Sequence, residues 1–136
     1  MIEQMPAAIS KIINELTDRG IEVWLIGSRA NPRDRPPKDW DFLVFGDERL
    51  LGELRERPLI QDLDLLVVFD GDEFESPWVR PTDGAKKTGS LSGWQWRRIG
   101  QDDATYRATK ERDGDNFAVD VTTSHAIRVY AKDHAV

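Results

Sequence analysis

The stretch that decides the fold is IEVWLIGSRANPRDRPPKDWDFLVFG, which occupies residues 21–46. Residues 21–27 form a short, almost wholly apolar run with β-branched side chains, the pattern of a strand that is buried on both faces. Residues 28–38 contain three prolines, which continue neither a helix nor an interior strand, so they predict a loop. Residues 39–46 are again mostly apolar and predict a second strand.

The flanking segments predict two helices and a third strand. Apolar residues recur at spacings of three and four over residues 2–16, the stripe of an amphipathic helix, and Gly20 follows as its expected end. Leucines at helical spacing predict a short helix over residues 47–57. Residues 62–70 read DLDLLVVFD and predict a strand that ends in a turn.

The second half of the chain is less regular. Residues 71–100 are rich in Gly and Pro and predict irregular structure. Residues 103–124 alternate on both sides of Asp-Gly-Asp-Asn at 113–116, which is the signal of a hairpin. This order of elements predicts an α+β fold, a mixed β-sheet with helices packed on it. A length of 136 residues fits one domain over residues 1–136.

Composition excludes several classes of protein. The formal net charge of −6 argues against a broad basic surface for non-specific duplex binding. The chain has no cysteine, which excludes disulfides and thiolate metal sites, and its two histidines are too few for a histidine-rich zinc site. Neither a signal-peptide pattern nor an apolar run of membrane-spanning length occurs, so we expect a cytoplasmic protein with no membrane partner.

Two carboxylates, Asp39 and Asp41, open the second strand. Residues two apart on a strand point to the same face, so both carboxylates would project together while Trp40 packs on the other face. Neighbouring carboxylates repel each other unless a cation lies between them, and Mg²⁺ prefers such oxygen ligands. Two such ions would make a phosphoryl or nucleotidyl transfer site. An isolated Asp-x-Asp pair is more often solvated turn residues, so its context decides.

The preceding loop supplies that context. Gly27 allows a ligand to approach the backbone closely, and Ser28 offers a hydroxyl and an N–H group to a phosphate oxygen. Positive charge gathers in the loop of an otherwise acidic chain, at Arg29, Arg33, Arg35 and Lys38. A triphosphate needs such a local reversal of charge. A merely solubilising loop explains the charge but not its position between the two motifs.

Ile26, Gly27 and Ser28 are followed by ten residues and then by Asp39, Trp40, Asp41 and Phe42. This pattern resembles the nucleotidyltransferase superfamily typified by DNA polymerase β, and within it the minimal nucleotidyltransferases. The resemblance covers residues 21–45 and implies a polymerase β palm-like fold. It also implies transfer of a nucleoside monophosphate from a nucleoside triphosphate to an acceptor hydroxyl or phosphate, at a site with two Mg²⁺ ions. Nucleotide binding would fall to Gly27, Ser28, Arg29 and Lys38, and metal binding to Asp39 and Asp41.

Members of this superfamily place a third acid on a neighbouring strand, and two residues are candidates here. Asp120 is favoured as the third catalytic and metal-binding acid because it shares a strand face with Ala118 and Thr122, where a carboxylate needs a partner or a metal. Asp64 is the alternative, in a setting like that of the smallest members. Asp64 also has a non-catalytic interpretation, as a residue near solvent at the start of a strand.

Other features leave alternatives open. Lys86, Lys87, Arg97 and Arg98 are candidates for phosphate contact. Trp94 and Trp96 are candidates for stacking on a base, although alternating tryptophans more often pack against a core. The acceptor is a small molecule, a protein or an RNA. A different class also fits: a non-catalytic or regulatory protein of the same fold, such as the antitoxin of a toxin–antitoxin pair, acting as a homodimer or with a toxin partner.

Overall fold

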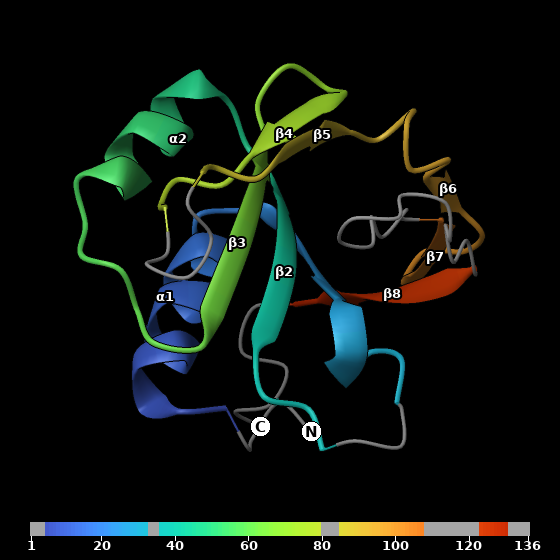
Figure 1. Cartoon of the computed structure of the whole chain (residues 1–136), viewed down its shortest axis with the longest axis horizontal. Coiled ribbons are helices and arrows are strands. Elements are labelled where there is room, and N and C mark those ends of the chain that lie inside the picture. Colours follow the sequence, from blue (N-terminus) through green and yellow to red (C-terminus); the bar gives the residue numbers. More distant parts are fainter. Residues whose placement is uncertain (1–4, 33–35, 80–84, 108–122, 131–136) are drawn as a thin grey trace.

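The structure, a computed structural model, describes residues 5–32, 36–79, 85–107 and 123–130. Within these residues it contains two α-helices, one 3-10 turn and a single eight-stranded sheet (Figure 1). In chain order the elements are α1 (Ala7–Asp18), β1 (Glu22–Ile26), η2 (Gly27–Arg29), β2 (Trp40–Phe45), α2 (Glu48–Arg55), β3 (Leu63–Val68), β4 (Glu73–Glu75), β5 (Thr88–Ser90), β6 (Arg97–Arg98), β7 (Asp103–Tyr106) and β8 (Ser124–Val129).

The first five helices and strands confirm the elements expected from hydrophobic patterning. Gly20 adopts a φ of +80° just after α1, in the left-handed region that glycine enters without a steric penalty. The Asp47 side chain caps α2 by accepting a hydrogen bond of 2.8 Å from the Leu50 N–H group. Among the described residues no helix has both the length and the apolar character needed to cross a bilayer.

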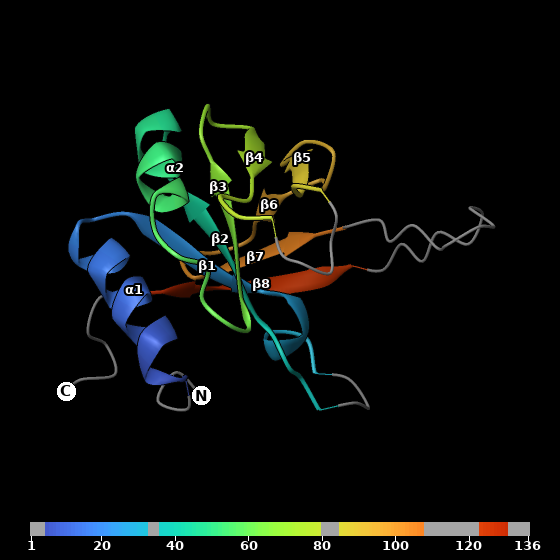
Figure 2. The same ribbon diagram turned by 60° about the vertical axis from the view of Figure 1, so that its left-hand side comes forward.

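The strands follow the order β5-β4-β3-β2-β1-β8-β7-β6 across the sheet. Strands β2 and β3 run parallel and are linked through α2, whereas every other neighbouring pair is antiparallel. Figure 2 shows α1 and α2 on the same side of the sheet. We call this side the outer face and the opposite side the inner face.

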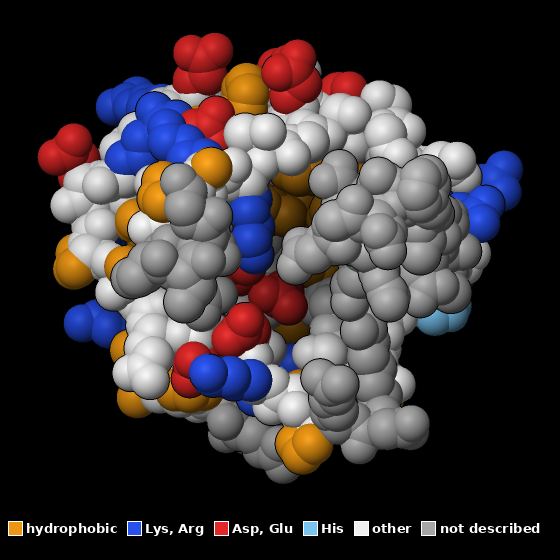
Figure 3. Space-filling view, in the orientation of Figure 1, with side chains coloured by type: hydrophobic (Ala, Val, Ile, Leu, Met, Phe, Trp, Pro, Cys, Tyr) orange, Lys and Arg blue, Asp and Glu red, His pale blue; other side chains and the backbone are white. Residues whose placement is uncertain are grey.

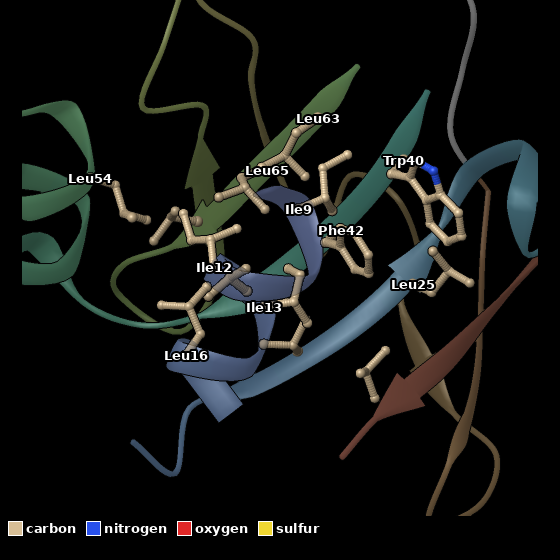
Figure 4. Packing of buried hydrophobic residues seen from close by; sticks show 14 of the residues in the cluster. Ile9, Ile12, Ile13, Leu16, Leu25, Trp40, Phe42, Leu54, Leu63 and Leu65 are labelled. Atoms are coloured by element: carbon tan, nitrogen blue, oxygen red, sulfur yellow. The ribbon is translucent and has the colours of Figure 1, made fainter. Parts of the chain in front are cut away.

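The outer face holds one hydrophobic cluster. Apolar residues of α1, such as Ile9, Ile12 and Ile13, pack on the strands in this cluster, and Leu54 of α2 joins them (Figure 4). The even-numbered residues of β2, Trp40, Phe42 and Val44, join this cluster, whereas Leu43 and Phe45 join a second cluster on the inner face. The expectation that Trp40 packs into a core is therefore confirmed, with 2% of the residue exposed.

The expected polymerase β palm-like fold, with helices as a main layer on a mixed sheet, is wrong. The described chain is mostly sheet, curled into a half-barrel, and its helices are short (Figure 1). Residues 71–100, expected to be irregular, contribute β4, β5 and β6. These strands have three residues or fewer, which is too short to produce a period-two pattern.

The two ends of the expected hairpin pair with each other in antiparallel register. Strand β7 pairs with β8, and Tyr106 lies opposite Ser124. The predicted turn at 113–116 lies outside the described residues.

The curl of the sheet follows from the short connection between its two edges. Strands β5 and β6 are the edge strands, and only residues 91–96 join them. Seven residue steps from Ser90 to Arg97 span at most about 25 Å. In a flat sheet of eight strands the edges would lie about 33 Å apart. The sheet must bend to let this connection close.

Aromatic side chains fill the inside of the bend. The ring centroid of Trp96 lies 5.2 Å from that of Trp24 on β1 and 5.9 Å from that of Phe45 on β2. Trp94 lies 4.7 Å from Phe74 on β4 and 5.1 Å from Tyr106 on β7. The residues that join the edge strands thus hold together both halves of the sheet, and the core reading of these tryptophans is favoured.

A charged contact adds to this closure. Arg98 on β6 forms an ion pair of 2.5 Å with Glu22 on β1, and its guanidinium lies 5.3 Å from the centre of the Trp24 ring. Trp24 Nε1 donates a 2.6 Å hydrogen bond to the same carboxylate. Burial raises the pKa of Glu22, but the hydrogen bonds from Trp24 and Arg98 outweigh it and leave the pKa below its usual value.

We predict that Trp96→Ala destabilises the protein by about 3 kcal/mol, at the low end for loss of a large aromatic side chain because Trp96 is partly exposed. Chemical denaturation measures this change. Ile99→Ala, at a side chain 56% exposed, is the control and should stay within about 0.5 kcal/mol of wild type. Equal losses in both variants would contradict closure by the aromatic cluster.

A second prediction concerns pH. Because the folded-state pKa of Glu22 is lowered, its contribution to stability is present above the usual value near 4.5 and is lost as the pH falls through the folded-state value. Glu22→Gln should therefore flatten the dependence of the unfolding free energy on pH between about 5 and 3. The exposed Glu56→Gln serves as the control. An unchanged slope in Glu22→Gln would refute the assignment.

Candidate functional site

The parallel pairing of β2 and β3 brings two carboxylates side by side. Asp41 lies opposite Asp64 in the register of these strands. Both precede inner-face residues by two positions, Leu43 and Leu66 respectively, and side chains two apart on a strand share a face. Asp64 is 8% exposed, and Asp41 is partly buried. The pair therefore stands on the inner face, at the start of both strands.

Asp39 lies just before β2, two residues from Asp41. It is partly buried, and its Oδ1 atom is shielded from solvent. Figure 3 shows acidic side chains on the floor of a hollow in this face of the molecule, with a Lys or Arg side chain at its wall. Asp120, the favoured third acid, lies outside the described residues, so Asp64 is the candidate that the described chain brings to Asp41.

Gly27 lies directly against Asp41. Its φ is +76°, and Ile26 is the residue opposite Asp41 in the antiparallel register of β1 and β2. A Cβ atom built on Gly27 would lie 3.1 Å from both Cβ and Cγ of Asp41 and still closer to Oδ2. Glycine is thus needed here both for its backbone conformation and for the space that the Asp41 carboxylate occupies.

The turn at Gly27 is tied by hydrogen bonds to β7 and to His125 of β8. The Gly27 N–H group donates a 2.9 Å hydrogen bond to Oη of Tyr106. The Gly27 carbonyl accepts from the Asn31 side chain at 2.9 Å, and that amide also pairs with the backbone of His125. Sequence reasoning missed both anchors. The alternation of β7 was a signal for an inward Tyr106, whereas nothing in the pattern singled out Asn31.

Arg29 contacts the residues that lead into β2. Its Cζ atom lies 4.1 Å from the centre of the Trp40 ring, a cation–π contact. Its guanidinium donates hydrogen bonds of 3.3–3.4 Å to the backbone carbonyls of Pro37, Lys38 and Asp39. In this arrangement Arg29, expected at the phosphates, positions Asp39, while Lys38 is exposed. Ser28 is partly exposed in η2, next to Gly27.

Lys87 brings positive charge to the acidic pair. Its Nζ atom lies 2.5 Å from Oδ2 of Asp64. The Asp64 side chain is 10% exposed and that of Lys87 is 47% exposed, so the carboxylate is fixed inside and the ammonium reaches it from solvent. A buried carboxylate is costly unless a cation or hydrogen-bond donors compensate it. Lys87 performs this role in the structure.

The residues present fit a Mg²⁺ ion. This ion commonly takes one or two protein carboxylates and completes its shell with water and substrate phosphates, and Asp41 and Asp64 offer such a pair. Among the described residues no group of three or more His, Cys, Asp or Glu side chains is gathered into a metal cage. The fit therefore rests on the pair and on oxygen ligands from a substrate.

Comparison of the chain with protein-family models, with curated proteins and with solved structures finds no match.

We predict that Gly27→Ala and Gly20→Ala differ sharply in cost. Both glycines have a positive φ, so each variant should lose about 1–2 kcal/mol from backbone strain. Nothing lies within 4 Å of a Cβ at Gly20, whereas one at Gly27 meets the Asp41 side chain. Gly27→Ala should therefore lose about 1–3 kcal/mol more. Denaturant unfolding measures both losses, and equal values would show that Asp41 does not occupy this space.

Proposed function

We propose that the protein catalyses Mg²⁺-dependent transfer of a nucleoside monophosphate from a nucleoside triphosphate to an acceptor. The observation that carries this proposal is the register pair of Asp41 and Asp64 on the inner face, next to the Gly27 turn. Two carboxylates at the same register position of neighbouring strands repel each other, so they favour a divalent cation between them. Figure 3 shows acidic side chains on the floor of a hollow, where a ligand could approach acids of this kind.

Asp41 and Asp64 would hold the cation, which would supply neutralisation of the charge that develops on the phosphates. Asp39 lies two residues before Asp41, and its carboxylate would accept the proton of an acceptor hydroxyl. Ser28 is partly exposed at the turn, and its hydroxyl would donate a hydrogen bond to a phosphate oxygen. The rigid anchors of the turn at Tyr106 and Asn31 would keep these groups in place, so that catalysis comes mainly from positioning.

A second candidate function is nucleotide or anion binding without transfer, in a regulatory protein. The ion pair between Lys87 and Asp64 favours it, because a built-in ammonium compensates the buried acid without any metal. The two functions differ in whether a divalent cation increases the affinity for a nucleoside triphosphate. Transfer requires that increase, whereas binding without a metal does not.

We predict that wild-type protein binds ATP in the presence of Mg²⁺ and that Asp41→Asn and Asp64→Asn each weaken this binding at least about 10-fold. Loss of one negative charge removes a ligand of the cation. Isothermal titration calorimetry with and without Mg²⁺ measures the effect.

Asp18→Asn is the matched control, since Asp18 is exposed at the end of α1, and it should bind as wild type. Circular dichroism checks that each variant folds. Failure of wild-type protein to bind ATP, GTP, CTP or UTP with Mg²⁺ would contradict the proposed function. ATP binding that is independent of Mg²⁺ and of Asp41 would favour the regulatory alternative.

A further inference from the structure

Lys87 reaches the acidic pair from outside strands β2 and β3. It precedes β5 by one residue, and its backbone carbonyl accepts a 2.9 Å hydrogen bond from Ser76 N–H. This bond continues the pairing of β4 with β5 and fixes the backbone of Lys87 beside the site. The side chain is half exposed, so it can leave Asp64 without rearrangement of the sheet.

The neighbouring lysine has a different partner. Lys86 Nζ lies 3.1 Å from Oε2 of Glu75, a carboxylate that also pairs with Arg55. Glu75 thus has two cationic partners, both at its Oε2 atom. Asp64 is more buried than Glu75, and Lys87 is the ammonium that contacts it. The two adjacent lysines therefore form ion pairs with two different acids.

We propose that Lys87 is an internal counter-ion that occupies part of the cation position at Asp64 and moves to the phosphates of a bound nucleotide. This inference rests on the proposed function and adds a consequence to it. A divalent cation that binds alone competes with Lys87 for Asp64, because the ammonium beside this carboxylate repels a second positive charge. A phosphate group offers the ammonium another partner and so frees Asp64 for the cation. Binding of cation and nucleotide is thereby coupled through one side chain.

The arrangement predicts effects of opposite sign for one substitution. Lys87→Gln removes the competing charge and should tighten binding of Mn²⁺ alone on the order of 10-fold. The same variant loses a phosphate contact and should weaken binding of ATP in the presence of EDTA by a similar factor. Lys86→Gln, the matched control, should change neither affinity. Lys87→Arg keeps the charge and should not tighten Mn²⁺ binding.

Electron paramagnetic resonance of free Mn²⁺ measures the first affinity, and isothermal titration calorimetry measures the second. Thermal unfolding provides a third measurement. Without metal, Lys87→Gln leaves Asp64 with less compensation and should melt at a lower temperature than wild type, and Mn²⁺ should raise its melting temperature more than that of wild type. If Lys87→Gln is unfolded without metal, refolding on addition of Mn²⁺ supports the proposal and failure to refold overturns it.

The outcomes separate this inference from the proposed function. Weaker or unchanged Mn²⁺ binding by Lys87→Gln overturns the counter-ion role, even if Asp41→Asn abolishes Mg²⁺-dependent ATP binding and so supports the function. Tighter Mn²⁺ binding by Lys87→Gln without ATP binding by any variant supports the competition for Asp64, but overturns the movement of Lys87 to a nucleotide together with the proposed function.

Discussion

The structure depends on one constraint, the short connection from β5 to β6. These strands lie at opposite edges of the sheet, yet only residues 91–96 join them. The sheet therefore has to curl, and Trp94 and Trp96 in the connection fill the space inside the curl. A curled sheet has one face wide enough for both helices and one face closed around aromatic side chains. The acidic pair lies on the second of these faces.

Side chains alternate along each strand and so give the two faces of the sheet different compositions. Residues of β2 and β3 that point outward are apolar and pack against α1 and α2. Those that point inward are apolar along most of each strand, but Asp41 and Asp64 interrupt them at the start. An acid at such a position needs compensation, which the protein supplies through Lys87. We infer that this cost is retained because the same carboxylates serve to bind a cation.

The sequence was sufficient for the elements with strong hydrophobic periods. Helices α1 and α2 and strands β1, β2 and β3 are each long enough to show their period, and all five lie where patterning placed them. Strands β4, β5 and β6 are too short for this signal. Their pairing depends on contacts between distant residues, such as Trp96 with Trp24. Without these strands the pattern predicts a mixed sheet with helices packed on it, whereas the described chain is mostly sheet.

The same limit applies to the site. Asp39, Asp41 and Gly27 were recognised because they are close in sequence, whereas the pairing of Asp64 with Asp41 depends on a parallel register that no local pattern specifies. Lys87 and Tyr106 reach the site from still more distant segments. Arg29 carries the right charge for a phosphate, but its guanidinium lies over the Trp40 ring and donates hydrogen bonds to the loop carbonyls of residues 37–39. Charge in a sequence does not reveal which partner a side chain finds.

The central claim is that the Asp41 and Asp64 carboxylates together form a cation site that a nucleotide completes. A crystal grown with Mn²⁺ and a non-hydrolysable ATP analogue tests it most directly, because anomalous scattering locates the metal. The claim predicts a peak in contact with oxygens of both carboxylates and of the phosphates, with Lys87 moved from Asp64 to a phosphate oxygen. Metal that binds elsewhere, or Lys87 that stays on Asp64 while the analogue is bound, would contradict it.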